Sequence, residues 1–229
     1  SVQDGKKATD IAIQKIKENK EKDLFLFLHF WDTHTPYNSP KKYLTYHGFD
    51  HKKSIIDKYY GSIKHVDEQV GRLYKALEDN DMADDTILII TADHGESLTE
   101  HDIFFDHHGL YEETTHVPLI IHCPQRFYAV SINSFVQHID ILPTIDSIIG
   151  LGSDELSFDG YSLLPLINGE KESIRDHILC EESYVQGKRC LRTTTHKYIT
   201  STDDRNGYCR YCNKVHHGPE EFYDLVKDP

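Results

Sequence analysis

Three short apolar runs constrain the fold of this 229-residue chain more than any other feature. They occupy residues 24–31 (LFLFLHFW), 86–91 (TILIIT) and 117–122 (VPLIIH). Apolar and polar residues do not alternate within them, which is typical of strands that are buried on both faces in a parallel sheet. We therefore predict three central strands that are covered by helices.

Segments with helical periodicity lie around these predicted strands. Residues 55–78 keep apolar side chains at a spacing close to 3.6 residues, and residues 7–22 carry a shorter apolar stripe. Residues 139–149 are predicted to form a third helix with Asp140 as its N-cap. The order of the elements predicts an α/β fold, in which a mostly parallel central sheet is flanked by helices.

We predict a division of the chain near residue 150. Residues 1–150 are expected to form the α/β core, and residues 151–229 a small C-terminal subdomain. In this second part the strand candidates are short and lie between turn signals, which favours an antiparallel sheet. The expected strands are residues 178–182, 188–191 and 197–200.

The charge balance argues against one class of partner. Lys and Arg total 25 and Asp and Glu total 38, so the formal net charge is −13, and the chain lacks the basic surface of a nucleic-acid binder.

None of the apolar runs has the length of a membrane span, and residues 1–10 lack the apolar stretch of a secretory signal. We expect neither nucleic acid nor membrane as a partner, and a cytoplasmic location is slightly favoured.

Side chains that can do chemistry follow two of the predicted strands. His34 comes soon after residues 24–31, and Asp93 and His94 come directly after residues 86–91. Ligands of open α/β sheets bind beyond the carboxyl ends of the strands. Asp93 and His94 could therefore give an oxygen and a nitrogen ligand to one divalent ion, while Gly95 lets the backbone approach a ligand. In the plainer interpretation Asp93 caps a turn, His94 lies on the surface and His34 bonds within its own turn.

A second group of candidates lies in residues 100–108 (EHDIFFDHH), which contain several His and Asp residues between two predicted buried strands. His107 and His108 are the best candidates because they lie closest to the next ordered segment. Glu112 and Glu113 are expected to begin a helix or to pair with a basic residue.

A series of motifs occurs in a fixed order along residues 24–229. They are DTHTPY (32–37), YYGSIKHVDEQVGRLYKAL (59–77), TILIITADHGESLTEH (86–101), HHGLYEETTHVPLII (107–121), HIDILPTI (138–145), DGYSLLPLI (159–167) and EFYDLVKDP (221–229). In this order they resemble the sulfatases of the alkaline phosphatase superfamily. The resemblance implies an alkaline phosphatase-like fold and metal-dependent hydrolysis of a sulfate ester.

The resemblance also implies a role for individual residues. Asp93 resembles a metal-binding aspartate, and His94 occupies the neighbouring ligand position, where many sulfatases have Asn. His34 resembles the histidine of an H-x-P motif that contacts the sulfate or the leaving group. His107 stands where many members have a sulfate-binding Lys, and His108 is a further substrate-binding candidate. We thus expect His34 and His107 to be catalytic, and Asp140 to be structural.

One part of the family pattern is missing from these residues. Sulfatases of this kind carry a Cys-x-Pro-x-Arg or Ser-x-Pro-x-Arg motif whose first residue becomes the formylglycine nucleophile, and the chain contains neither. We expect a truncated, C-terminal part of a sulfatase that is inactive by itself. We also expect it to expose apolar surface and to pair with the missing N-terminal part or with a second copy.

The five cysteines allow three interpretations. Cys209 and Cys212 form a C-x-x-C pair, which could join Cys180 and Cys190 in a four-thiolate zinc site or in two disulfides. Free thiols in a reducing compartment are the third interpretation. Cys123 follows a predicted strand and is expected in the core.

The function expected from these observations is that of a sulfuric ester hydrolase, with a small-molecule or glycan sulfate ester as the substrate. Ca or Mn is the expected metal, and Mg is a further option. His94 in place of Asn keeps a phosphodiester or phosphonate monoester hydrolase as an alternative, because a nitrogen ligand favours a transition metal. A non-catalytic remnant or partner-dependent module is the third alternative.

Overall fold

The computed structural model describes residues 4–37, 40–46, 55–152, 157–183, 186–203, 208, 213–215 and 218–227. The chain separates into two compact units. The first consists of Ser1–Ile89 with Ile120–Gln125, and the second of Ile90–Leu119 with Arg126–Pro229. The predicted boundary near residue 150 stays a prediction.

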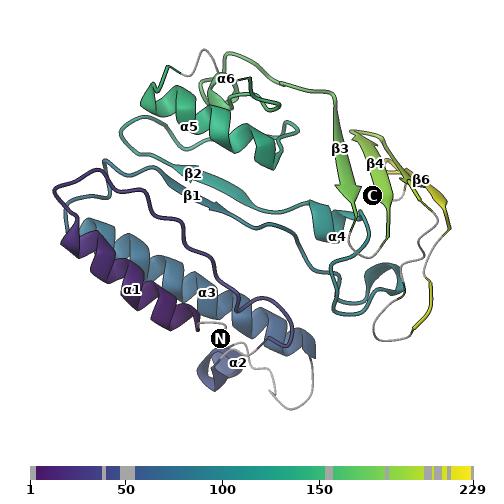
Figure 1. The fold of residues 1–229 in the computed structure, drawn as a ribbon, viewed down its shortest axis with the longest axis horizontal. Coiled ribbons are helices and arrows are strands. Elements are labelled where there is room, and N and C mark those ends of the chain that lie inside the picture. Colours follow the sequence, from purple (N-terminus) through teal and green to yellow (C-terminus); the bar gives the residue numbers. More distant parts are fainter. Residues whose placement is uncertain are drawn as a thin grey trace. The chain divides into compact units, whose positions relative to one another are not determined.

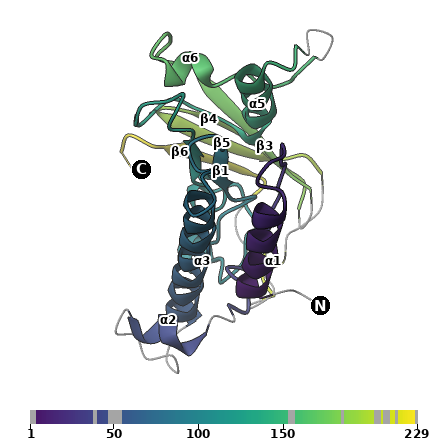
Figure 2. The same ribbon diagram turned by 90° about the vertical axis from the view of Figure 1, so that its left-hand side faces the viewer.

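Helices dominate the first unit. Helix α1 (Gly5–Glu18) packs along helix α3 (Ile55–Glu78), as Figures 1 and 2 show, and the short helix α2 (Lys41–Tyr46) also contacts α3. Asp4 is the N-cap of α1, because its side chain accepts a hydrogen bond from the backbone N of Lys6 at 2.9 Å. The structure confirms α3 at its predicted bounds, whereas α1 begins and ends earlier than predicted.

Residues 24–31 are not a strand, so the first of the three strand predictions is wrong. Phe25 is 87% exposed and Phe27 is 80% exposed, which confirms the expected exposure of apolar surface. A strand is stable only when its backbone N–H and C=O groups pair with a neighbour. None of the described segments pairs with residues 24–31, so apolar composition alone does not make them a strand.

Strands β1 (Leu88–Thr91) and β2 (Leu119–His122) form a two-stranded sheet. Both were predicted, although each begins two residues later than expected. Burial on both faces is not observed, because Ile120 is 54% exposed. A mostly parallel central sheet is therefore not confirmed for the part of the chain that the structure describes.

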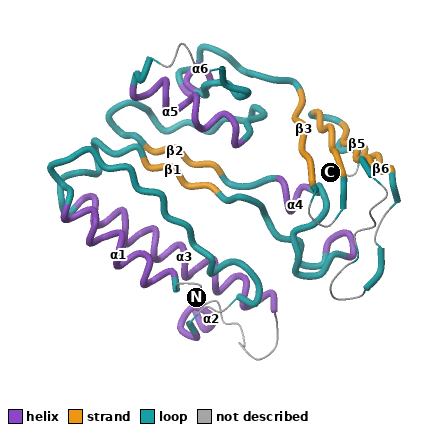
Figure 3. The backbone as a smooth tube through the Cα atoms, in the orientation of Figure 1, coloured by secondary structure: helices purple, strands orange, loops and turns teal. Residues whose placement is uncertain are grey.

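The second unit contains an antiparallel sheet of four strands in chain order, drawn in orange in Figure 3. Its strands are β3 (His177–Glu182), β4 (Lys188–Thr193), β5 (His196–Ser201) and β6 (Glu220–Asp224). The first three confirm the predicted C-terminal antiparallel region, and β6 was not predicted. Inward residues of this sheet, Cys190 and Ile199, share a core with Ile103, Leu110 and Tyr111.

The remaining elements of the second unit are short. They are the 3-10 helices η1 (Glu100–Asp102) and η2 (His138–Asp140), and helices α4 (Glu112–Thr115), α5 (Ile141–Ile149) and α6 (Leu164–Ile167). None of the helices within the described ranges is long and apolar enough to cross a lipid bilayer.

Asp140 does not cap α5 with its side chain, in contrast to the prediction. Its fully buried carboxylate instead accepts hydrogen bonds from the backbone N of Gln137 at 2.7 Å and of Tyr161 at 2.9 Å, and from both terminal nitrogens of Arg175. Burial opposes ionisation, but Arg175 and these N–H groups outweigh it and hold the pKa of Asp140 below its ordinary value. The expected structural role of Asp140 agrees with this network.

The predicted four-cysteine site lies only partly within the described residues. Cys180 and Cys190 are directly opposite each other in the β3–β4 pair, and both are free thiols. Cys209 and Cys212 lie outside the described residues, so zinc binding by the four cysteines stays a prediction. Cys123 is buried, as expected for a core residue.

Candidate metal centre in the loop after strand β1

An isolated bridge fixes the base of the loop that follows β1. The backbone N of Ser97 donates to the carbonyl oxygen of Asp106 at 3.0 Å, and the N of Asp106 donates back to Ser97 at 3.3 Å. Glu96 and His107 are the next residues outward on the two sides of this bridge. Residues that are far apart in the loop are thus held next to each other at its base.

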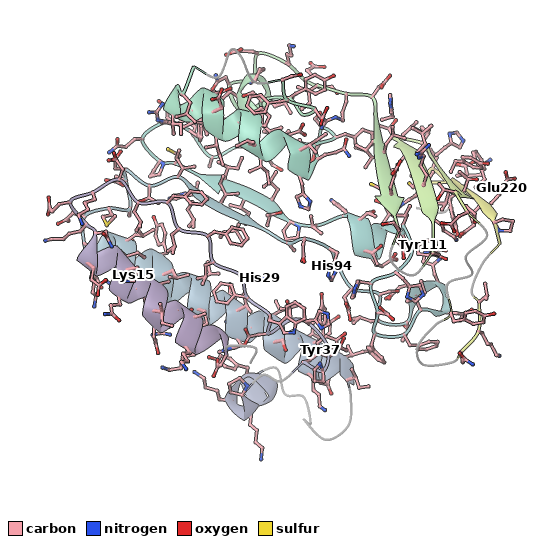
Figure 4. The ribbon with its side chains drawn as sticks, in the orientation of Figure 1. Lys15, His29, Tyr37, His94, Tyr111 and Glu220 are labelled. Atoms are coloured by element: carbon pink, nitrogen blue, oxygen red, sulfur yellow. The ribbon has the colours of Figure 1, made fainter. Side chains whose placement is uncertain are left out.

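Three side chains meet beside this bridge. One possible ligand atom from each of His94, Glu96 and His107 lies within 4.8 Å of the other two. The rings of His94 and His107 are stacked with centroids 4.1 Å apart, and Nδ1 of His107 is 3.9 Å from a carboxylate oxygen of Glu96. Figure 4 labels His94 in the loop between β1 and α4. The structure therefore brings the predicted His94 and His107 together.

The local geometry determines which nitrogen of His94 can bind a metal. Nδ1 of His94 is 2.7 Å from the carbonyl oxygen of Gly95, and a carbonyl oxygen can only accept a hydrogen bond. Nδ1 therefore carries the proton of the neutral ring, and Nε2 carries the lone pair that a metal needs. Nε2 of His94 and a carboxylate oxygen of Glu96 are a nitrogen and an oxygen donor that fit a divalent ion, and His107 lies beside them.

Asp93 lies at the edge of this cluster. Its side chain is 72% exposed, and one carboxylate oxygen is 3.8 Å from Nε2 of His94. The other oxygen accepts a hydrogen bond from the backbone N of His94 at 3.1 Å, which is the turn-capping contact of the plainer interpretation. The two roles are compatible, because the capping contact uses only one of the two carboxylate oxygens.

Gly95 packs closely against helix α4 in this structure. Its N donates to the carbonyl oxygen of Thr114 at 2.9 Å, and a Cβ at this position would overlap the carbonyl oxygen of Glu113. The expectation was a close approach to a ligand. The structure shows instead that the missing side chain allows the loop to lie against α4.

The antiparallel sheet holds the segment that carries His107. The Glu112 carboxylate accepts from Nε of Arg192 and from Nζ of Lys197, both at 3.0 Å, which confirms that Glu112 begins a helix and pairs with basic residues. The hydroxyl of Tyr111 donates to Glu221 at 2.7 Å. The side chains of β4, β5 and β6 thus fix the chain just after the predicted site.

Charge pairing decides the protonation of the two glutamates in these contacts. Burial opposes the ionisation of Glu112 and Glu221. The bonds from Arg192 and Lys197 to Glu112, and from Lys188 to Glu221, outweigh that cost, so the pKa of both carboxyls is lowered. Both glutamates are therefore ionised at neutral pH.

His108 is buried beside the cluster and does not line an open surface. It is 5% exposed, and its Nδ1 is 3.5 Å from a carboxylate oxygen of Asp106. That nitrogen makes no hydrogen bond within the described part of the chain. Its predicted substrate-binding role stays a prediction.

His34 belongs to the other compact unit. Its Nδ1 donates to the carbonyl oxygen of Thr35 at 2.8 Å, and its ring stacks on Trp31 with centroids 4.2 Å apart. The bond within the turn agrees with the plainer interpretation, and it also fixes the orientation of the ring. The predicted sharing of one site by His34 and Asp93 stays a prediction.

Glu96 is the member of the cluster that the sequence reasoning missed. Its side chain is only 6% exposed, although it lies in a loop. The available signal was its position two residues after His94 in the DHGE turn. The position of His107 opposite Glu96 depends on the Ser97–Asp106 bridge, which the sequence pattern did not indicate.

Comparison with known families gives two matches. The family model described as Sulfatase matches residues 4–151, and the model described as N-sulphoglucosamine sulphohydrolase, C-terminal, matches residues 99–229. Among curated proteins, the choline-sulfatase of Rhizobium meliloti is 29% identical over 175 residues, or 75% of this chain and 31% of the relative. An arylsulfatase of Clostridium perfringens is 28% identical over 176 residues, or 75% and 34%. The chain thus spans about a third of the length of these curated relatives.

Solved structures share the fold of this chain. The structure of yidJ from Bacteroides fragilis matches with a TM-score of 0.76 at 24% identity, covering 98% of this chain and 52% of that one. BT4656, in complex with D-glucosamine-2-N,6-O-disulfate, is 29% identical with a TM-score of 0.62, covering 76% and 35%. A phosphonate monoester hydrolase of Agrobacterium radiobacter has the same identity and TM-score, 29% and 0.62, covering 76% and 36%.

Proposed function

Because the chain belongs to the sulfatase family, we propose that it is part of a metal-dependent hydrolase that acts on sulfate esters. The proposal rests chiefly on the cluster of His94, Glu96 and His107 in the loop after β1. Asp93 and His94 act as metal ligands in this proposal, and Glu96 is added as a third candidate ligand.

The protein groups around the metal supply orientation and charge. A bound divalent ion neutralises the oxygens of an ester and lowers the pKa of a nucleophile. Nε2 of His94 is the nitrogen available to the metal, because Nδ1 donates its proton to the carbonyl oxygen of Gly95. The buried Glu96 carboxylate favours a cation over an anion at this position.

His107 and His34 are proposed to contact the sulfate group or to protonate the leaving oxygen. The stacking of His107 on His94 places it beside the proposed metal ligands. Nδ1 of His34 donates its proton to the carbonyl oxygen of Thr35. Nε2 is therefore the atom proposed to exchange a proton with the substrate. His108 is proposed as a further substrate-binding group.

A neighbouring structure suggests a class of substrate. BT4656 was solved with a glucosamine that carries two sulfate groups. We therefore favour a sulfated sugar over a simple aryl sulfate for this chain.

Metal binding tests the proposal most directly. Titration of the metal-free chain with Mn²⁺ and Ca²⁺ is expected to show a site whose affinity falls at least tenfold in the His94→Ala and Glu96→Gln variants. His177→Ala is the matched control, because His177 is an exposed histidine on β3. Equal affinity in all four proteins would contradict the proposed ligands and would favour a non-catalytic module.

The residues present also predict that the 229-residue chain hydrolyses no aryl sulfate by itself. It contains no Cys-x-Pro-x-Arg or Ser-x-Pro-x-Arg sequence, and loss of the reacting group leaves only residual catalysis. Robust hydrolysis by the purified chain, with contaminating sulfatase excluded, would overturn this expectation.

The alternative is a phosphonate monoester hydrolase. It is favoured by the Agrobacterium radiobacter structure, which matches as well as BT4656 does, and by the nitrogen ligand His94. The two functions differ in the anion that the metal-loaded chain binds. If the chain binds sulfate more tightly than phenylphosphonate, the sulfatase is supported, and the reverse order supports the alternative. His107→Ala is expected to weaken the binding of both anions.

A further inference from the structure

A separate group of possible ligands lies in the first unit. Asp4, Asp32 and His65 each have one ligand atom within 4.8 Å of the other two. Asp4 is the N-cap of α1, Asp32 follows residues 24–31, and His65 projects from the buried side of α3. The cluster therefore joins three segments that are far apart in the sequence.

Two of the three side chains are almost completely buried. The side chain of His65 is 2% exposed and that of Asp32 is 9% exposed. Nε2 of His65 and Oδ2 of Asp32 make no hydrogen bond within the described part of the chain. A buried imidazole nitrogen and a buried carboxylate oxygen without partners are unfavourable, so the cluster lacks a group that would satisfy them.

The distances fit a metal ion better than a hydrogen bond. Nε2 of His65 is 3.3 Å from Oδ1 of Asp32 and 3.4 Å from Oδ1 of Asp4, and neither contact has the geometry of a hydrogen bond. Ligands about 2.1 Å from a tetrahedral zinc ion lie about 3.4 Å from one another. Each of the two carboxylate oxygens thus lies at the distance of a neighbouring ligand from Nε2 of His65.

Gly5 leaves the space that this arrangement needs. Its backbone N donates to Oδ1 of Asp32 at 3.1 Å, which fixes the carboxylate. A Cβ on Gly5 would lie 2.6 Å from Oδ2 of Asp32, the oxygen that makes no hydrogen bond. Any side chain at this position would therefore press on the carboxylate.

The surroundings of His65 allow the tautomer that binds a metal. Nε2 of Gln69 lies 3.4 Å from Nδ1 of His65, and it also has two oxygen acceptors for its two protons, the carbonyl oxygen of His65 at 3.3 Å and the hydroxyl of Tyr43 at 3.5 Å. Arg72 donates to the amide oxygen of Gln69 at 2.7 Å and so fixes the orientation of the amide. Metal binding through Nε2 of His65 requires the tautomer in which Nδ1 keeps its proton and Gln69 donates to these two oxygens.

We propose that Asp4, Asp32 and His65 bind one divalent transition-metal ion of the zinc type. Two carboxylate oxygens and one imidazole nitrogen suit such an ion, and the side chain of Asp4, 63% exposed, leaves one side of the site open to solvent. The ion joins the start of α1 to α3 and to the segment that contains His34, two residues after Asp32. Its main effect is to stabilise the first unit and to position this segment.

The experiment uses the full chain with His94→Ala, so that the other cluster lacks a ligand. We expect the metal-free protein to bind Zn²⁺ and to give the visible absorption of a tetrahedral site with Co²⁺. Addition of Asp32→Asn or His65→Asn removes one equivalent of Zn²⁺ and the matching part of the Co²⁺ absorption, whatever the four cysteines bind, and Asp4→Asn weakens the binding of this equivalent at least tenfold. Glu18→Gln, on the same helix as the Asp4 cap, is the control and leaves binding unchanged.

A second measurement separates ligand loss from misfolding. Zn²⁺ is expected to raise the unfolding temperature of the His94→Ala protein, and Asp4→Asn, which changes an exposed side chain, removes this rise. Gly5→Ala is expected to weaken Zn²⁺ binding, because the added methyl group meets the Asp32 carboxylate. Failure of the His94→Ala protein to bind Zn²⁺, or equal binding after Asp32→Asn, would show that His65 is simply enclosed by two carboxylates.

Discussion

Residues 24–31 form the longest apolar run of the chain, whereas β3, β4 and β5 have mixed composition, and their side chains alternate between exposed and more buried positions. The alternating segments form a regular antiparallel sheet, while the apolar run forms no strand and exposes Phe25 and Phe27. The difference lies in what surrounds each segment. Each strand of the sheet has a neighbour in register and an inward face that is covered, and the described residues provide neither for residues 24–31.

Charged residues contribute to the inward face of this sheet. Lys188 and Lys197 are 4% and 3% exposed, and each pairs with a glutamate, Glu221 or Glu112. A buried charge is tolerated only when it is paired and hydrogen-bonded. The inward face of the strands therefore holds lysines as well as apolar residues.

The largest expected effect comes from removing one member of a buried pair. Lys188→Met removes the buried cation that pairs with the carboxylate of Glu221, which we expect to lower the free energy of unfolding by about 3–5 kcal/mol. Arg189→Met, at the next position on β4, removes an exposed pair with Glu181 and should cost less than about 1 kcal/mol. Urea denaturation measures both, and equal losses would mean that the inward face is not a closed environment.

A core truncation compares the two regions directly. Ile199→Ala, at a side chain with no exposed surface, is expected to lower the free energy of unfolding by about 2–5 kcal/mol. Phe27→Ala removes a larger side chain, but this side chain is 80% exposed. We therefore expect the free energy of unfolding to change by less than about 0.5 kcal/mol. A large loss from Phe27→Ala in thermal or urea unfolding would show that residues 24–31 are packed in solution.

Acid should weaken the second unit. Glu112, Glu221 and Asp140 all have pKa values below their ordinary values, which are 4.5 for Glu and 3.8 for Asp. Each carboxylate therefore contributes stability at pH values above its ordinary pKa, and this stability is lost as the pH falls through the lower pKa of the folded state. We expect the free energy of unfolding to fall between pH 5 and pH 3, and less steeply in Glu112→Gln. A flat profile over this range would contradict the pairing.

The smallest effect on stability is expected from a double change in the exposed run. Phe25→Ser with Phe27→Ser should alter the free energy of unfolding by less than about 0.5 kcal/mol, because both rings are exposed. The same change should reduce self-association, since exposed apolar patches promote contact between molecules. Sedimentation velocity of the two proteins at matched concentration measures this, and an unchanged distribution would rule out the run as the contact.

The sequence predicted elements whose signal is local. The periodicity of α3 gave its bounds, and the short strand candidates gave β3, β4 and β5. Residues 24–31 were misassigned because pairing depends on a partner strand, which composition does not report. Strand β6 was missed for the related reason that it is recognised by its pairing with β5.

The candidate site shows the same division. His94 and Asp93 could be chosen from their position directly after a strand, and His107 from its histidine-rich segment. Glu96 was missed although it lies two residues after His94, and the group formed by Asp4, Asp32 and His65 could not be predicted. Glu96 lies next to His107 because of the Ser97–Asp106 bridge, and the second group forms through the packing of α1 against α3. Neither contact leaves a periodic pattern in the sequence.

The Ser97–Asp106 bridge has a consequence for how such a protein can change over generations. It holds Glu96 and His107 at the base of the loop, and Ile103 anchors the far part in the core. Thr99, Glu100 and Asp102, which lie between these two anchors, are exposed. Among these, Glu100 accepts hydrogen bonds from the backbone N of Leu98 and of Thr99 and so helps to hold the loop. Substitutions of the exposed Thr99 side chain are therefore expected to leave the spacing at the base unchanged, so that the tip and the base of one short loop can vary separately.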